Sequence, residues 1–223
     1  MKRTKRIISL MLSLSLIFSV TSYSGAKAEN VTTSPTNNYP IVLVHGLFGW
    51  GNTEIAHLNY WGGTDSIREL LQSKGYTVYT PTIGPVSSNW DRACELYAYL
   101  AGGTVDYGAA HSKKYGHERY GRKFCGVLPE LNDPDSTLKI HLVGHSMGGE
   151  TIRMLAQLLE NGDAQEQVET TDGSISPLFS GKCRHWINSI TTIATPHDGS
   201  QFDDTEYKLE PLMHIFGAAL ATA

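Results

Sequence analysis

The chain has 223 residues, a formal net charge of −4 and three cysteines. That length is enough for one sizeable core. The acidic balance disfavours nucleic-acid binding, because proteins of that class carry basic surfaces that neutralise phosphates. The odd cysteine count excludes a framework in which every cysteine is paired.

The first 28 residues have the pattern of a secretory signal peptide. Four basic residues among the first six precede an apolar run at residues 7–20, and Ala26-Lys27-Ala28 is a small-x-small cleavage site. A transmembrane anchor needs about 20 apolar residues, whereas this run has 14 and contains serines. We therefore expect a secreted, extracellular protein with no transmembrane anchor. Cleavage removes five basic and no acidic residues, which lowers the formal charge from −4 to −9.

A glycine loop follows the first predicted strand. Residues 29–38 are rich in Thr, Ser, Asn and Pro and predict a flexible leader, and the apolar residues 40–44 are typical of a buried parallel strand. His45-Gly46-Leu47-Phe48-Gly49 comes next. Ligands bind beyond the carboxyl ends of parallel strands, where a hydrolase places an oxyanion-binding N–H group, which we assign to Leu47. The alternative is a plain glycine turn.

The next segments alternate between helix and strand. A helix is predicted from about Thr64, followed by a strand at 77–80, a helix at 90–100 and a later strand at 187–194. This order is typical of an α/β fold with a parallel sheet. In the first helix the expected inward side chains are Ile67, Leu70 and Leu71, and Gly75 ends the helix. In the second they are Ala93, Cys94 and Tyr97, and Gly102 ends the helix.

The most informative stretch is residues 138–149. Its first six residues suit a strand, Gly144-His145-Ser146-Met147-Gly148 fits G-x-S-x-G, and apolar residues at helical spacing follow. A strand, a sharp turn and a helix form a nucleophile elbow, with the serine above a helix N-terminus that favours an oxyanion. We expect Ser146 to be the nucleophile and the Met147 N–H the second oxyanion donor. The alternative is an ordinary serine in a glycine-rich turn.

An insertion at about residues 103–129 carries candidate metal ligands. It is longer than a simple helix–strand connection, and loops of this length are usually functional. His111 and His117, with Asp91 from the preceding helix, provide two imidazoles and a carboxylate, a set that suits zinc. The alternative is two surface histidines in a polar loop.

Other reactive residues have weaker patterns. Cys94 is expected to be a small buried apolar residue, and no pattern decides whether Cys125 and Cys183 form a bridge. His197 follows the last predicted strand and is a candidate base, with a role in shaping that loop as the alternative.

Taken together, these motifs resemble the secreted triacylglycerol lipases of the Geobacillus and staphylococcal type. The resemblance implies an α/β-hydrolase fold, with a mostly parallel sheet and helices on both faces. It also implies hydrolysis of triacylglycerol esters at an oil–water interface through a serine and an acyl-enzyme. The matching stretches are residues 40–46, 60–63, 88–93, 102–111, 115–121, 144–149, 176–179 and 191–199.

The resemblance also implies roles for individual residues of this sequence at the positions that match the family's motifs. Ser146 matches the nucleophile, and the N–H groups of Leu47 and Met147 match the oxyanion hole. The family binds a structural zinc, and three of its four ligands match Asp91, His111 and His117. Residues 39–223 then form the N-terminal part of a lipase domain.

Some family features have no counterpart among these residues. The triad Asp and His, the fourth zinc ligand and the calcium site are expected beyond Ala223, so we expect a chain incomplete at its C-terminal end, as a fragment or through a frameshift. Without a base, a serine keeps its proton and is a poor nucleophile. The alternatives are therefore a carboxylesterase or phospholipase on the same scaffold, or an inactive lipase fragment.

Overall fold

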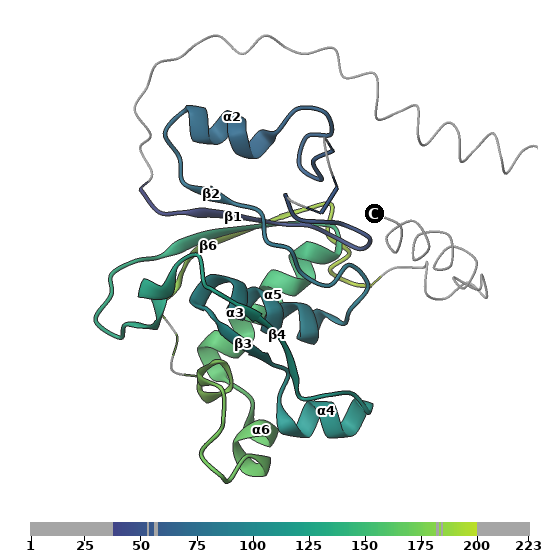
Figure 1. Ribbon diagram of the computed structural model, residues 1–223, viewed down its shortest axis with the longest axis vertical. Helices are drawn as coiled ribbons and strands as arrows, with labels where there is room; N and C mark the ends of the chain where they lie inside the picture. Colours follow the sequence, from purple (N-terminus) through teal and green to yellow (C-terminus); the bar gives the residue numbers. More distant parts are fainter. Residues whose placement is uncertain (1–37, 53, 56–57, 182, 184, 200–223) are drawn as a thin grey trace, which may run out of the picture. The chain divides into compact units, whose positions relative to one another are not determined.

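The computed structural model describes residues 38–199, except residues 53, 56–57, 182 and 184 (Figure 1). The predicted signal peptide, almost all of the predicted leader and residues 200–223 lie outside this range. None of the helices within the range is both long and apolar enough to cross a bilayer.

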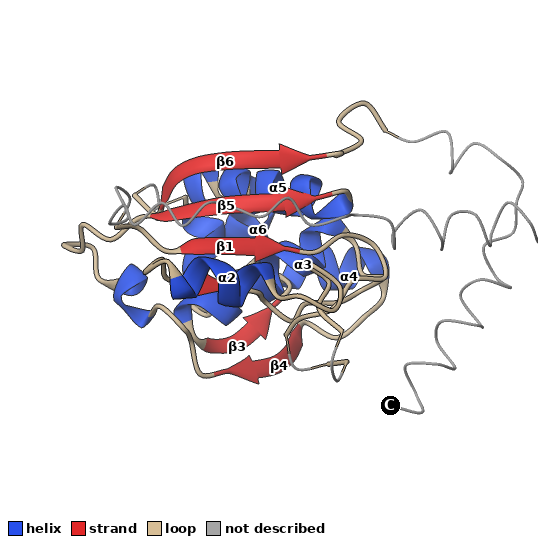
Figure 2. Ribbon diagram, turned by 90° about the horizontal axis from the view of Figure 1, so that it is seen from above, coloured by secondary structure: helices blue, strands red, loops and turns tan. Residues whose placement is uncertain are grey.

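Four parallel strands form the central sheet, in the order β2-β1-β5-β6. Val44 lies opposite Gly144, and His145 lies opposite Ile193, so the carboxyl ends of β1, β5 and β6 meet at one edge. Figure 2 shows these three strands side by side and pointing the same way. The strands are β1 (Ile41–Val44), β2 (Val78–Tyr79), β5 (Ile140–His145) and β6 (Ile187–Ile193).

Helices lie on both faces of this sheet (Figures 1 and 2). The long helices α3 (Asn89–Ala101) and α5 (Met147–Asn161) pack on one another, and α5 packs on β5. The short helix α2 (Ile67–Ser73) lies on the opposite face. Besides the helix of the insertion described next, the remaining helical segments of the described residues are α6 (Ala164–Glu169) and the 3₁₀ turns η1 (Pro129–Asn132) and η2 (Pro177–Ser180).

The insertion after α3 is ordered. It begins with β3 (Gly103–Asp106), continues through α4 (Ala109–Tyr115) and returns as β4 (Tyr120–Phe124). The two strands pair antiparallel in a separate two-stranded sheet. The insertion is therefore a small sheet with its own helix.

Apolar side chains between the helices and the sheet form the core. The alternation of β5 places Ile140 and Leu142 inward with no exposed surface, where they join Val42 of β1. The helices supply fully buried residues at helical spacing, among them Leu96 and Leu100 of α3 and Ile152 and Leu155 of α5. Burial of one such side chain contributes about 1.5–3 kcal/mol.

The prediction for the first helix was partly wrong. It begins at Ile67 rather than near Thr64, because Ser66 caps it by accepting the N–H of Glu69 at 3.2 Å. None of its residues is buried, and Leu70 is 53% exposed. The reason is that this seven-residue helix packs on β2, a short strand at the edge of the sheet.

Other predictions for the elements were closer. The strand before the G-x-S-x-G sequence begins at Ile140, two residues later than expected. Gly75, with φ +90°, follows the last turn of α2 as predicted. Cys94 is buried as predicted, and Cys125 and Cys183 are both free thiols.

Candidate active site

Ser146 lies in a sharp turn between β5 and α5. It has φ +54° and ψ −131°, and the next residue is the first of the helix. The turn leaves no room for side chains on either side. A Cβ on Gly144 would lie 2.5 Å from the Gly148 carbonyl group, and a Cβ on Gly148 would lie 2.3 Å from the carbonyl oxygen of Val44. The chain therefore adopts the strand, turn and helix that the sequence predicts.

Backbone strain is concentrated around this turn. Three non-glycine residues of the described ranges have positive φ: Phe48 (+55°), Ser146 (+54°) and Ala194 (+49°). Each follows the carboxyl end of one of the adjacent strands β1, β5 and β6. Such strained residues cluster at functional sites, where the surrounding structure holds them in place.

Two backbone N–H groups near Ser146 are available as donors. Met147 begins α5, so its N–H has no acceptor within the helix. In the loop after β1, the N–H groups of Gly46 and Phe48 donate to the Tyr60 hydroxyl and the Pro85 carbonyl. The Leu47 N–H between them has no acceptor among the described residues. The loop also approaches the serine closely, because a Cβ on Gly46 would lie 2.8 Å from the Cβ of Ser146.

A buried arginine supports this loop from α3. The Arg92 side chain, with no exposed surface, donates to the carbonyl oxygens of His45 and Gly84, and its Nε donates to Thr151 Oγ1 at 2.9 Å. Burial lowers the pKa of Arg92 to about 10, and the nearby Glu95 opposes this shift. Sequence reasoning assigned Arg92 no role, although its position on the inward face of a helix was the available signal.

No histidine of the described residues hydrogen-bonds to Ser146 Oγ. Nδ1 of His197 lies 3.0 Å from Arg153 Nη1, and its Nε2 lies 3.0 Å from Thr192 Oγ1. His45 is buried with its Nδ1 2.9 Å from the Gly46 carbonyl oxygen. These contacts agree with a structural role for both histidines, which was the alternative considered for His197.

The three candidate metal ligands converge. Asp91 lies in the first turn of α3, His111 on α4 and His117 just after α4, and one ligand atom from each lies within 4.8 Å of the others. His111 Nε2 is 3.2 Å and His117 Nε2 is 3.9 Å from Asp91 Oδ1. Two histidines that lie 20 and 26 positions after Asp91 in the sequence therefore offer their nitrogens to the same point as its carboxylate oxygen.

The polar groups around this cluster fit a metal ion. Asp91 Oδ1 is buried and accepts no hydrogen bond of good geometry, while Asp91 Oδ2 accepts the Ser88 hydroxyl at 2.9 Å. His117 Nδ1 lies 2.9 Å from the carbonyl oxygen of Glu118. Donation from Nδ1 leaves Nε2 unprotonated and able to bind a metal.

Aromatic rings contact both imidazoles. The Trp90 ring stacks on His111 at 4.9 Å between centroids, and Phe179 stacks on Trp90 at 5.5 Å. Tyr107 meets the His117 ring edge-on at 5.6 Å. Burial lowers the pKa of His111, and although Asp91 opposes this shift, the net effect favours the neutral imidazole that binds metals.

The sequence matches a known family model over most of its length. Residues 37–215 match the family model described as "Lipase-like, C-terminal domain". The chain is 49% identical over 197 residues to Lipase 2 of Staphylococcus aureus, which covers 86% of this chain and 28% of that protein.

Solved structures of related proteins superpose on this chain. The lipase of Staphylococcus hyicus superposes with a TM-score of 0.75 at 44% identity, over 82% of this chain and 48% of that one. EstA from Clostridium botulinum superposes with a TM-score of 0.71 at 50% identity, over 82% and 43%.

The chain spans about a quarter of the length of the curated relatives and less than half of these solved chains. Its parallel sheet, helices on both faces and structural neighbours confirm the predicted α/β-hydrolase fold. The chain belongs to the lipase-like C-terminal domain family.

Proposed function

We propose that this chain is the nucleophile-bearing part of a secreted lipase that hydrolyses triacylglycerol esters at an oil–water interface. The supporting observation is the strained Ser146 at the carboxyl end of β5, beside a loop whose Leu47 N–H lacks an acceptor among the described residues. Residues 39–223 are then the N-terminal part of the lipase domain, and residues 1–28 direct its secretion.

The geometry supports acyl transfer through Ser146. Its Oγ attacks the ester carbonyl carbon, and the N–H groups of Leu47 and Met147 donate to the oxygen that becomes negatively charged. Collapse of this intermediate expels the alcohol and leaves an acyl-enzyme, which water then hydrolyses. The attack needs a base to accept the Oγ proton, and no histidine of residues 38–199 that the structure describes is hydrogen-bonded to Ser146 Oγ.

A chimeric enzyme tests this role. The homologous span of Staphylococcus aureus Lipase 2 is replaced by the matching residues of this chain, so that Lipase 2 supplies the remainder. We expect the chimera to release fatty acid from emulsified triglyceride, and the same chimera with Ser146→Ala to be inactive. Equal rates for the two would overturn the assignment of Ser146.

The isolated chain gives a complementary measurement. We expect it to hydrolyse a chromogenic ester no faster than its Ser146→Ala variant, because no histidine of the described residues contacts Ser146 Oγ and a serine without a base keeps its proton. A clear rate that depends on Ser146 would instead show that a base lies within this chain.

The rival activities are those of a carboxylesterase and a phospholipase on the same scaffold. Hydrolysis by the chimera of a series of esters with increasing acyl length separates these classes. A preference for soluble short-chain esters over emulsified triglyceride would contradict the lipase assignment.

We also propose that Asp91, His111 and His117 hold a structural zinc ion. Bound zinc supplies a fixed link between α3 and the insertion at residues 103–129, and no chemistry at Ser146. The buried Asp91 Oδ1, which accepts no hydrogen bond of good geometry, and the available His117 Nε2 support this assignment. The family also implies calcium, for which we assign no residue of this chain.

A further inference from the structure

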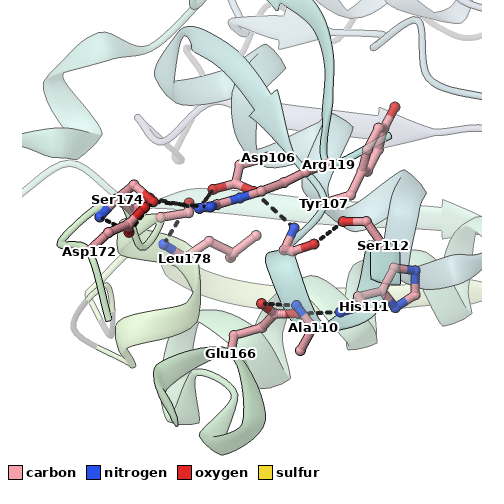
Figure 3. Close-up of polar contacts among 12 residues, drawn as sticks. Asp106, Tyr107, Ala110, His111, Ser112, Arg119, Glu166, Asp172, Ser174 and Leu178 are labelled. Atoms are coloured by element: carbon pink, nitrogen blue, oxygen red, sulfur yellow. Dashed lines mark hydrogen bonds and ion pairs between the residues drawn. The ribbon is translucent and has the colours of Figure 1, made fainter. Parts of the chain in front are cut away.

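A buried carboxylate holds the helix that carries His111. Glu166, on α6, is 1% exposed, and Figure 3 shows its side chain directed at the first turn of α4. Its two oxygens accept the backbone N–H of Ala110 at 3.0 Å and that of His111 at 2.7 Å. The first N–H groups of a helix have no acceptor within it, and a negative charge is favoured there.

The surrounding backbone accommodates this carboxylate closely. Gly108 precedes α4 with φ +94°, and a Cβ on it would lie 2.3 Å from Glu166 Oε1. Glu166 is held in turn by its own helix, because Asp163 caps α6 by accepting the Glu166 N–H at 2.9 Å. Gln167 then ties α6 to η2 by donating to the Phe179 carbonyl at 2.7 Å. The carboxylate is therefore a fixed point against which α4 is placed.

The charge on Glu166 has no cationic partner among the Lys and Arg side chains of the described residues. Burial of a carboxylate is costly unless it is well hydrogen-bonded, and here two backbone N–H groups provide the compensation. A neutral side chain of similar size would fill the same volume at lower cost. We therefore attribute the presence of a carboxylate at this position to its hydrogen bonds with the two backbone N–H groups, one of which belongs to His111.

A second contact fixes the other end of the same segment. Arg119 donates to both oxygens of Asp106 at 2.9 Å, and its Nη2 also donates to the Ser174 carbonyl at 2.9 Å (Figure 3). Arg119 is two residues beyond His117. The backbone around both histidines is therefore held by contacts to residues 166–174, a segment that contains none of the three ligands.

We propose that Glu166 is a positioning residue for the metal centre. By fixing the first turn of α4, it presents His111 Nε2 to Asp91 Oδ1 before an ion is bound, so that binding does not have to order the helix. This inference rests on the metal site proposed above. Sequence reasoning gave no signal for it, because Glu166 lies 55 residues beyond His111.

The test compares two charge-neutralising variants on the same helix. Glu166→Gln keeps the size of the side chain but replaces one acceptor oxygen with an NH₂ group that faces an N–H. Glu169→Gln is the matched control, because Glu169 also links α6 to α4 but through an exposed pair with Lys113 at 3.5 Å. Zinc affinity is measured on the full chain by competition with a chromophoric chelator, and cobalt(II) absorption reports the geometry of the ligands.

We expect Glu166→Gln to weaken zinc binding about tenfold to a hundredfold and to change the cobalt spectrum, whereas Glu169→Gln leaves both unchanged. Glu166→Asp, which keeps the charge but is one methylene shorter, should give an intermediate loss, and it decides the matter if Glu166→Gln does not fold. Unchanged zinc affinity in a folded Glu166 variant, even with a lower melting temperature, would overturn the positioning role alone. If the unsubstituted chain binds no zinc, the metal site and the role of Glu166 are both wrong.

Discussion

The Tyr60 hydroxyl lies 2.6 Å from Nδ1 of His145, the residue directly before the elbow serine. The same hydroxyl accepts the Gly46 N–H at 2.9 Å. The Tyr60 side chain thus joins the loop after β1, which carries Leu47, to the end of β5, which directly precedes Ser146. The Tyr60 ring also packs edge-on against Trp50 and Trp61, which holds it in this position.

Removal of the Tyr60 hydroxyl should lower the stability of the fold. Tyr60→Phe leaves the Gly46 N–H without its acceptor, and loss of such a partner costs about 1–3 kcal/mol. We expect a decrease of that size in the free energy of unfolding, measured by urea denaturation. Tyr120→Phe is the control, since Tyr120 is 53% exposed, and it should change stability by less than about 0.5 kcal/mol. Equal effects of the two variants would show that the Tyr60 hydroxyl is unimportant.

Arg92 should be among the most sensitive residues of the chain. Arg92→Met leaves the carbonyl groups of buried His45 and half-buried Gly84 without their donor. Hydrogen bonds to charged groups contribute about 1.5–3 kcal/mol each, so we expect a loss of at least about 3 kcal/mol in chemical denaturation. Arg153→Met removes an arginine that is 51% exposed and should cost less than about 1 kcal/mol. A small effect at Arg92 would contradict its role as the support of the loop.

Zinc should bind and stabilise the chain through the three ligands. We expect metal analysis to find about one zinc per chain, and added zinc to raise the melting temperature, because an ion that binds only the folded state stabilises it. The double variant His111→Ala/His117→Ala should lose both effects, whereas His197→Ala should keep them. Full zinc content in the double variant would refute these ligands.

Acid should destabilise the fold partly through His45. Burial, with a smaller contribution from the Arg92 charge, lowers the pKa of His45 from 6.5 to about 4. Between these values the unfolded chain takes up a proton that the folded chain does not. The stability due to neutral His45 is therefore complete above about pH 6.5 and is lost as the pH falls towards 4, by about 3 kcal/mol in total.

Histidine NMR spectra check the origin of this effect. The His45 imidazole should keep the nitrogen shifts of the neutral ring at pH 5.5 in the folded protein. A titration midpoint near 6.5 for this ring would show that His45 contributes no such dependence on pH.

Sequence patterns predicted the sheet and the elbow well, because both depend on local features. The apolar runs gave β1 and β5, and glycines at 144 and 148 indicated the tight turn. The supports of the site were harder to predict. Arg92 reaches His45 from 47 residues away, and Glu166 reaches His111 from 55 residues away. Such contacts depend on tertiary packing, for which neither spacing nor hydrophobic period gives a signal.

The α2 helix was mispredicted for a related reason. Its apolar spacing satisfies the helical period, but periodicity does not tell whether a sheet surface is available for that face. Its position on the two-residue strand β2 leaves Ile67 and Leu70 partly exposed.

The positive φ of Ser146 lowers the stability of the fold, although the serine at this position is needed for activity. A serine in this conformation costs about 1–3 kcal/mol relative to a relaxed backbone, whereas glycine adopts positive φ readily. Glycine at position 146 should thus give a more stable chain that has lost its nucleophile. Laboratory evolution that selects for heat resistance alone would therefore tend to remove the hydroxyl group, and a screen for improved variants has to score ester hydrolysis together with survival on heating.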